Sequence, residues 1–325
     1  MTGRAVYFDL EGPLSPQDNA YEVLSLGKNG RKIFEVISRY DDVLTLQKRE
    51  GYEPGDTLKL IVPFLLYYGI SEEEIERVSK KAMITNGAKE VVDELRQDDW
   101  HVRVISTSYQ QHAYNIGRQL GVDPEDIACT ALPLTDYLEL LGEEELSILE
   151  EMETKIVDDF TEAGDEEVVK VLDKFFFQDL PKTQLGRVFE EVEVVGGRRK
   201  VKALLEFSLR DGDDIKDSVA VGDSITDYKM LRYVRDKEGL ALAFNGNEYC
   251  IPYADVAVAS LSLMDILPFI EAFKSGGKKA VKETARDIGE SKAGTAWIKE
   301  ADLKEIIKIH GEYRSKVRGE AGKLG

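Results

Sequence analysis

Residues 5–14 read AVYFDLEGPL. The first four are small, β-branched or aromatic, which is typical of a short buried strand, expected here over residues 4–9. Asp9 and Glu11 follow the apolar run two positions apart, and Gly12 and Pro13 come next. Alternate residues of an extended chain point to the same side, so both acids can address one point beyond the carboxyl end of the strand. The stretch therefore predicts a buried strand that presents two carboxylates, either as a solvated strand end or as part of an active site.

Apolar runs and amphipathic segments alternate through much of the remaining chain, which predicts right-handed βαβ units. The expected strands after the first are HVRVIS (101–106), DIACTAL (126–132), DSVAVGD (217–223), GLALAFN (239–245) and DVAVAS (255–260). Several of these runs are apolar almost throughout, as in parallel strands that are covered on both faces. The sequence thus predicts an α/β fold with a doubly wound, mainly parallel sheet.

Three segments depart from this alternation and have helical periodicity. They are a helical cap insert at 15–83, a second, acidic helical insert at 134–195 and a Lys-rich helical tail at 266–325, in which no strand is expected. The sheet-forming core is then made of residues 1–14, 84–133 and 196–265. Within the cap insert, Ser71 and Glu74 have the spacing of a capping box and predict a helix start.

Composition limits the classes of function. The net charge is −19, so a surface that binds nucleic acid or anionic lipid through its overall charge is not expected. Cys129 and Cys250 lie far apart in apolar surroundings, which argues against a disulfide framework or a zinc site. The longest apolar run, LIVPFLLYYGI, is too short to span a bilayer, and the first residues have no leader-like apolar stretch. A cytoplasmic protein is expected.

Polar residues at other strand ends extend the group begun by Asp9 and Glu11. Ser106 closes one predicted strand, and Asp223 and Asp227 follow another. Ligands of doubly wound sheets bind beyond the carboxyl ends of the strands, where these residues are expected to meet. Four acids in one crevice repel one another unless a cation neutralises them, and oxygen-only ligands favour Mg²⁺. Asp9, Glu11, Asp223 and Asp227 are therefore the candidate metal residues.

A phosphate-bearing substrate would also need a positive side chain, and two lysines begin the helix before the Asp223 strand. Leu204 and Phe207 follow Lys200 by four and seven residues, so all three lie on one helix face that is expected to be buried. The same spacing from Lys202 gives a less apolar face. Lys200 is preferred, and Lys202 stays an alternative. Asn245 and Asn247 are placed to contact substrate at the rim, although both also suit a turn.

The ordered set DLEGP, VISTSY, a lysine and GDSITD resembles the four motifs of the haloacid-dehalogenase superfamily, and most closely its phosphoserine-phosphatase-like members. A helical insert after the first motif is similar to their cap. The resemblance spans residues 4–133 and 196–260 of the predicted core. It implies a Rossmann-like core and a magnesium-dependent phosphatase or phosphotransferase that acts on a small phosphorylated metabolite through an aspartyl-phosphate.

The resemblance also implies the roles of individual residues. Asp9 is the expected nucleophile, and Glu11 is the expected general acid and base, whose main-chain carbonyl would contact Mg²⁺. Asp223 is an expected metal ligand, and Asp227 is expected to hold the metal site. The phosphate oxygens are expected to be bound by the lysine and by Ser106 and Thr107.

Two positions depart from the family pattern. Glu11 stands where the family usually has Asp, and Pro13 replaces the usual Thr or Val. A catalytically weak or silent relative, acting as a regulatory or scaffold subunit, is therefore the alternative function, and dehalogenase chemistry is a third and weaker one. The acidic insert and the C-terminal helices offer surface for a protein partner or for homo-oligomerisation.

Overall fold

The structure is a computed structural model that describes residues 3–160 and 163–319. Residues 1–2, 161–162 and 320–325 lie outside the described residues, and with them the ends of the predicted core and tail and two positions of the acidic insert. No helix in the described part of the chain is both long and apolar enough to cross a membrane. Cys129 and Cys250 are both free thiols.

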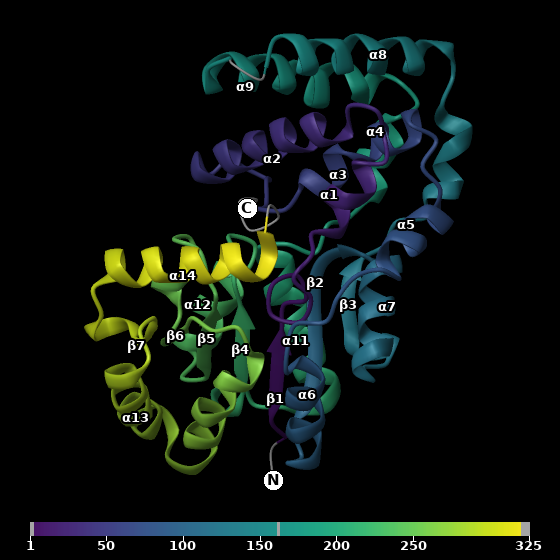
Figure 1. The fold of residues 1–325 in the computed structure, drawn as a ribbon. Coiled ribbons are helices and arrows are strands. Elements are labelled where there is room, and N and C mark those ends of the chain that lie inside the picture. The colour runs from purple at the N-terminus through teal and green to yellow at the C-terminus, as the bar shows by residue number, and fades with distance from the viewer. Residues whose placement is uncertain (1–2, 161–162, 320–325) are drawn as a thin grey trace.

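A seven-stranded sheet forms the centre of the molecule, in the order β3-β2-β1-β4-β5-β6-β7 (Figure 1). All neighbouring strands run parallel except β7, which is antiparallel to β6. The strand that leads into Asp9 and Glu11, β1, is therefore an interior strand between β2 and β4. The bounds are β1 (Ala5–Phe8), β2 (His101–Tyr109), β3 (Ile127–Thr130), β4 (Val219–Gly222), β5 (Leu240–Phe244), β6 (Val256–Val258) and β7 (Thr295–Trp297).

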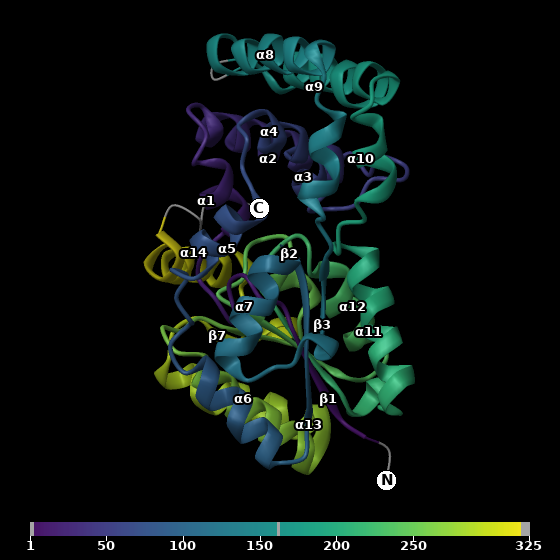
Figure 2. The ribbon, with the colours of Figure 1, turned by 90° about the vertical axis from the view of Figure 1, so that its right-hand side faces the viewer.

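Helices cover both faces of this sheet, as Figure 2 shows. One apolar cluster joins one face to α6 (Ala88–Gln97), α7 (Gln110–Leu120) and α13 (Leu267–Ser291). A second cluster joins the opposite face to α11 (Arg198–Asp211), α12 (Tyr228–Asp236) and α14 (Leu303–Arg318). Alternate residues of β1 enter the two clusters, Val6 and Phe8 on one side and Ala5 and Tyr7 on the other. The predicted doubly wound α/β fold is confirmed.

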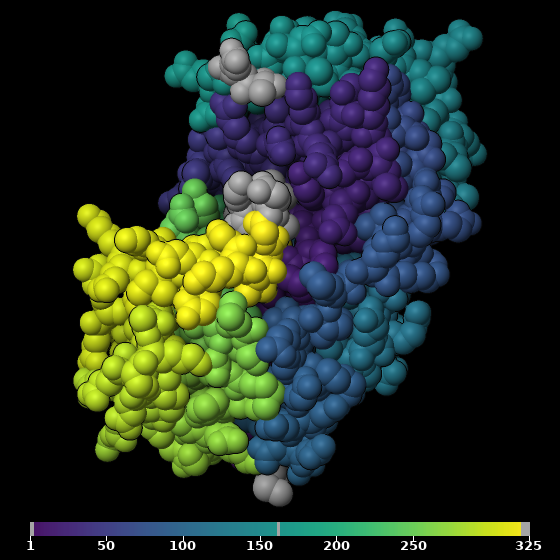
Figure 3. Space-filling model, viewed as in Figure 1, coloured from purple at the N-terminus to yellow at the C-terminus, as the bar shows by residue number. Residues whose placement is uncertain are grey.

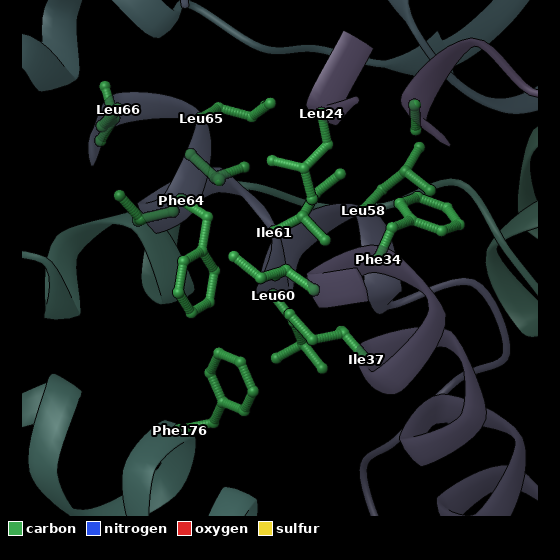
Figure 4. Packing of buried hydrophobic residues seen from close by; sticks show 14 of the residues in the cluster. Leu24, Phe34, Ile37, Leu58, Leu60, Ile61, Phe64, Leu65, Leu66 and Phe176 are labelled. Atoms are coloured by element: carbon green, nitrogen blue, oxygen red, sulfur yellow. The ribbon is translucent and has the colours of Figure 1, made fainter. Parts of the chain in front are cut away.

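Beyond one end of the sheet, the two inserts pack together as a single helical cap with its own hydrophobic core. The first insert provides α1 (Asn19–Leu24), α2 (Gly30–Leu46), α3 (Thr57–Leu60), α4 (Val62–Tyr67) and α5 (Glu72–Ser79), and the second provides α8 (Glu143–Asp158), α9 (Asp165–Lys174) and α10 (Gly186–Glu191). Figure 4 shows Phe176 of the second insert facing Leu60 and Phe64 of the first. Helix α5 begins with the predicted capping box, in which Ser71 and Glu74 bond to each other's main chain.

Short helical turns connect these elements. They are η1 (Pro124–Asp126), η2 (Leu134–Leu140), the π-turn η3 (Phe175–Asp179), η4 (Leu180–Lys182), η5 (Ile215–Asp217), η6 (Ile251–Tyr253), η7 (Leu263–Ile266) and η8 (Ile298–Glu300).

Two of the predicted elements are wrong in part. The tail was expected to be helical throughout, but it contains β7, which pairs with β6 and gives the sheet its last strand. Three residues are too few to show a period-2 pattern, and helices on both sides obscured the strand. Strand β2 continues to Tyr109, so Ser106 lies inside the strand and not at its end. The apolar run stops at Ile105, while the ladder to β3 resumes at Tyr109 after an irregularity.

Candidate active site

A narrow cavity of about 80 Å³ lies between the cap and the carboxyl ends of the central strands. The core contributes Asp9, Thr107 and Ser224 to its lining, and the cap contributes Phe34 and Leu58. This is the edge of the sheet at which the sequence predicted a ligand site. Figure 3 shows how closely the cap segments lie against the core and the C-terminal helix on one side of the molecule.

Lys200 lies at the centre of the charged residues in this site. Its side chain is fully buried, and its Nζ donates to Asp9 Oδ1 at 2.6 Å and to Asp227 Oδ1 at 2.7 Å. Burial alone would lower the pKa of Lys200, but Asp227 and Asp9 outweigh it and raise that pKa. Lys202, in contrast, is 65% exposed and lies 3.8 Å from Glu193. Of the two candidate lysines, Lys200 is the one that the fold brings to the acids.

Asp9 is held where β1 ends, because its main-chain N–H donates to the carbonyl of Val221 in β4 at 2.9 Å. Burial raises the pKa of the Asp9 carboxyl well above its usual range, and the nearby Asp227 adds to that shift, while Lys200 opposes it. The site therefore holds buried carboxylates whose mutual repulsion is relieved by cations.

The loop after β4 is shaped by Asp227, which precedes α12. Its Oδ2 accepts hydrogen bonds from the main-chain N–H groups of Asp223 and Ser224, both at 3.0 Å. A Cβ on Gly222 would lie 2.6 Å from the Asp227 Cβ, so only glycine fits beside this turn. Asp227 thus fixes the main chain at Asp223 and Ser224.

Carboxylate oxygens of Asp9, Asp223 and Asp227 lie within 4.8 Å of one another, a separation that suits a single metal ion. Asp223 Oδ1 is buried and has no hydrogen-bond partner among the described residues, as expected of an oxygen that awaits a ligand. Oxygen-only donors of this kind fit Mg²⁺. The side chain of Glu11 is not part of this group. A Cβ on Gly12 would lie 2.4 Å from Asp223 Cγ, so the main chain next to Glu11 passes close to the cluster.

The Glu11 side chain turns toward the cap. Its Oε1 accepts a hydrogen bond of 3.0 Å from the main-chain N–H of Asn19, the first residue of α1, and lies 3.9 Å from His112 Nε2. Burial raises the pKa of Glu11 to about 8, and Asp18 adds to the shift, while hydrogen bonds from Ser108 and Asn19 oppose it. Near neutral pH this carboxyl can hold a proton, as a general acid must.

The predicted substrate-binding residues fall into two groups. Ser106 is buried, with its Oγ accepting a hydrogen bond of 3.0 Å from the Ser108 N–H, and Thr107 lines the cavity. Asn245 instead ties its loop to Ser260 through bonds of 2.8 and 2.9 Å. Asn247 accepts a hydrogen bond of 3.1 Å from the Tyr249 N–H. The two asparagines therefore stabilise the loop after β5, and neither is among the described residues that line the cavity.

Among the site residues that the sequence analysis missed, two from α14 contact a predicted metal residue. Arg314 donates through Nη1 to Asp223 Oδ2, and to the Asp223 carbonyl at 3.1 Å. Arg318 Nη1 lies 2.9 Å from the same Oδ2. Their side chains are only 4% and 6% exposed. The one available signal was their i, i+4 spacing, which a solvated Lys- and Arg-rich helix shows equally often.

No family model matches the chain. The structure of gene product AF1437 from Archaeoglobus fulgidus is similar over 100% of this chain and 99% of its own, with a TM-score of 0.86 and 31% sequence identity. The chain belongs to the same family as AF1437.

Solved phosphoserine phosphatases have the same fold at lower identity. A phospho-aspartyl intermediate analogue of phosphoserine phosphatase matches 83% of this chain and 100% of its own, with a TM-score of 0.55 and 19% identity. The apo form matches the same shares with a TM-score of 0.53 and 18% identity. The phosphoserine-phosphatase-like fold predicted from the motifs is therefore confirmed.

Among curated proteins, the phosphoserine phosphatase of Archaeoglobus fulgidus is 20% identical over 203 residues, which are 62% of this chain and 43% of that protein. The match to this chain thus spans less than half the length of the curated relative.

Proposed function

We propose that the protein is a magnesium-dependent phosphatase, or phosphotransferase, that acts on a small phosphorylated metabolite through an aspartyl-phosphate at Asp9. One observation carries the proposal. At the end of the central strand, a buried lysine holds Asp9 Oδ1 at 2.6 Å within a group of three carboxylates that suits a metal ion. The similarity of the fold to phosphoserine phosphatases supports it.

In this proposal, Asp9 attacks the phosphorus and the bond to the leaving oxygen breaks. Glu11 donates its proton to that oxygen, and its pKa of about 8 keeps the proton available near neutral pH. Glu11 then takes a proton from water, which attacks the phosphorus and releases inorganic phosphate and the Asp9 carboxylate. Lys200, contacting Asp9, remains charged throughout and stabilises the negative charge that spreads over the phosphoryl oxygens.

Asp9, Asp223 and Asp227 would hold Mg²⁺, with the main-chain carbonyl of Glu11 as a further candidate ligand. When bound, the ion neutralises carboxylates and phosphoryl oxygens together. Ser106 and Thr107 are proposed phosphate contacts, since β2 brings them to the same edge of the sheet.

Contacts between the cap and the core support the choice of a small substrate. Glu53, in the loop before α3, accepts hydrogen bonds from Lys229 Nζ at 2.7 Å and from the Arg198 N–H at 2.8 Å. Asp56 and Arg199 form a second contact of 2.8 Å between the cap and the core. These contacts hold the cap against α11 and α12, and a cap held in this way would limit access to small substrates and exclude water during the reaction.

The test is release of phosphate from an aryl phosphate and from a panel of phosphorylated metabolites, including phosphoserine, with Mg²⁺ and with EDTA. Wild type is expected to hydrolyse small esters only with metal. Lys200→Met should lower kcat/KM by about 10²- to 10³-fold, because it removes a charge that contacts the nucleophile. Lys202→Met, exposed and two residues away, should leave the rate unchanged. Full activity in EDTA, or equal loss in both variants, would contradict the proposal.

A non-catalytic subunit is the second candidate, and the arginine contacts on Asp223 favour it, because they neutralise this carboxylate without a metal. Failure of every substrate, together with co-purification of a defined partner, would support that alternative.

A further inference from the structure

The C-terminal helix α14 reaches the site from the far end of the chain. In Figure 1 it lies across the upper edge of the sheet, between the ends of β4 to β6 and the cap. Its last turns carry Arg314 and Arg318, which lie on one helix face because they are four residues apart. Both guanidinium groups contact the same atom, Asp223 Oδ2. A candidate metal ligand therefore already has a cationic partner.

Several other contacts hold α14 in the position from which the two arginines reach Asp223. His310 Nδ1 accepts a hydrogen bond of 3.0 Å from the Gly246 N–H, and its other ring nitrogen lies 2.9 Å from the carbonyl of Gly294. Ile306 packs in the same apolar cluster as β1 and β4. Arg318 Nε also donates to the Pro16 carbonyl at 3.2 Å, in the segment that leads to the cap. Packing along the helix thus places the two arginines.

The carboxylates of the candidate metal group already have cationic partners, and Arg318 also interacts with the nearby carboxylates of Asp18 and Glu11. The three carboxylates that suit a metal, Asp9, Asp223 and Asp227, face three buried cations, Lys200, Arg314 and Arg318. A divalent ion would add two positive charges within a few ångströms of two guanidinium groups. In a buried site of low effective dielectric, that repulsion is much stronger than in water.

We propose that Arg314 and Arg318 form an internal counter-cation on Asp223 that opposes Mg²⁺ binding at the same carboxylate. Docking of the last turns of α14 and occupancy of the metal site then weaken each other by the same factor, because coupling between two binding events is reciprocal. The proposal rests on the metal site of the proposed function, and it makes α14 a determinant of metal affinity. Asp223 Oδ1, which has no hydrogen-bond partner among the described residues, is the oxygen still available to the ion.

The direct test is Mg²⁺ binding to the full chain by isothermal titration calorimetry, independent of any phosphatase activity. Arg318→Gln is expected to tighten Mg²⁺ binding by about 5-fold or more, the usual lower range of such coupling. Lys316→Gln is the matched control, since it removes one positive charge from an exposed position of the same helix and should leave the affinity unchanged. Unchanged or weaker binding by Arg318→Gln would overturn the proposal.

A second measurement on wild type needs no variant to fold. Mg²⁺ should increase hydrogen exchange of the backbone amides in the last turns of Leu303–Arg318, while β1 and β4 stay protected. Slower exchange there on adding Mg²⁺ would mean that metal and arginines cooperate, which overturns the proposal. A raised KM with unchanged Mg²⁺ affinity in Arg318→Gln would also overturn the proposal, because the arginine would then be a substrate contact.

Failure of this inference and failure of the proposed function give different results. Tighter Mg²⁺ binding by Arg318→Gln without hydrolysis of any ester would contradict the phosphatase alone. Metal-dependent hydrolysis with equal Mg²⁺ affinities in wild type and Arg318→Gln would contradict the counter-cation alone. Absence of Mg²⁺ binding to both proteins would overturn the counter-cation and the metal dependence together.

Discussion

The acidic insert at 134–195 and the C-terminal tail were both predicted as helical additions to the core, and the structure uses them differently. The insert packs its apolar side chains into the cap, and none of its described residues lines the cavity beside Asp9. The tail adds β7 to the sheet and brings Arg314 and Arg318 into the site. Two segments with a similar helical pattern therefore have different roles. The insert contributes apolar packing to the cap, and the tail contributes charged side chains to the site.

The difference follows from what each segment buries. Phe175 and Phe176 of the insert are buried aromatics that contact other aromatic rings, such as Tyr40 and Phe64 of the first insert. The buried groups near the end of the tail are polar, namely His310 and the two arginines, and each has a specific partner. We therefore expect the stability of the insert to fall when a buried side chain is made smaller. The stability of the tail should fall when an individual polar contact is removed.

The largest effect is expected from Phe176→Ala. The ring is fully buried, with its centroid 6.1 Å from that of Tyr40, so the change should leave a cavity in the cap core. The free energy of unfolding of the cap should fall by about 3–5 kcal/mol. Chemical denaturation followed by tyrosine fluorescence would measure it. Phe177→Ala is the control, because Phe177 is 40% exposed. Similar losses from both variants would contradict a shared cap core.

An intermediate effect is expected from His310→Gln, and it should depend on pH. Removing the paired ring should lower the free energy of unfolding by about 1–3 kcal/mol at pH 7.5. Burial lowers the pKa of folded His310 to about 4, below its ordinary value of 6.5. The unfolded chain therefore binds the proton first, and the stability that His310 contributes is present above pH 6.5 and is lost as the pH falls toward 4.

The penalty of His310→Gln should accordingly shrink by about 1 kcal/mol between pH 7.5 and pH 5.5, since one pKa unit corresponds to about 1.4 kcal/mol. Denaturation curves of wild type and variant at both values test this. Lys316→Gln, which keeps His310, should differ from wild type by the same amount at each pH. A penalty that grows on acidification would contradict a neutral buried imidazole.

The smallest effect is expected from Arg39→Gln. Arg39 in α2 donates through Nε to Asp165 of α9 at 2.6 Å, but the two side chains are 39% and 59% exposed. Exposed ion pairs contribute less than about 1 kcal/mol, so the thermal midpoint should hardly change. A loss as large as that of Phe176→Ala would show that charge, and not apolar packing, joins the two inserts.

The sequence predicted the core because its signals are local. Apolar runs ending in Asp9 and Asp223 predict strands and the edge where they meet, and the stripe that follows Lys200 predicts the buried lysine. Cap and tail helices were predicted from periodicity in the same way. Which face of each helix is buried depends on contacts between segments that are far apart in the sequence. The contact between the rings of Phe176 and Tyr40 is an example.

The arginine contacts illustrate the limit of local patterns. Arg314 lies 91 residues from Asp223 along the chain. Its neighbours in sequence resemble those of any solvated basic helix. Only the docking of α14, through His310 and Ile306, shows that these charges are buried. Strand β7 was missed for a related reason, because three residues form a strand only when β6 is beside them.

The central claim is that Asp9 becomes phosphorylated, and intact-mass spectrometry tests it most directly. Glu11→Gln removes the base that activates water, so an aryl phosphate with a good leaving group should leave a phosphoryl adduct on this variant after an acid quench with Mg²⁺ present. Peptide mapping should place the adduct on Asp9, and Asp9→Asn should carry none. Turnover by Glu11→Gln at the wild-type rate with no adduct, or an adduct that persists in Asp9→Asn, would contradict the account.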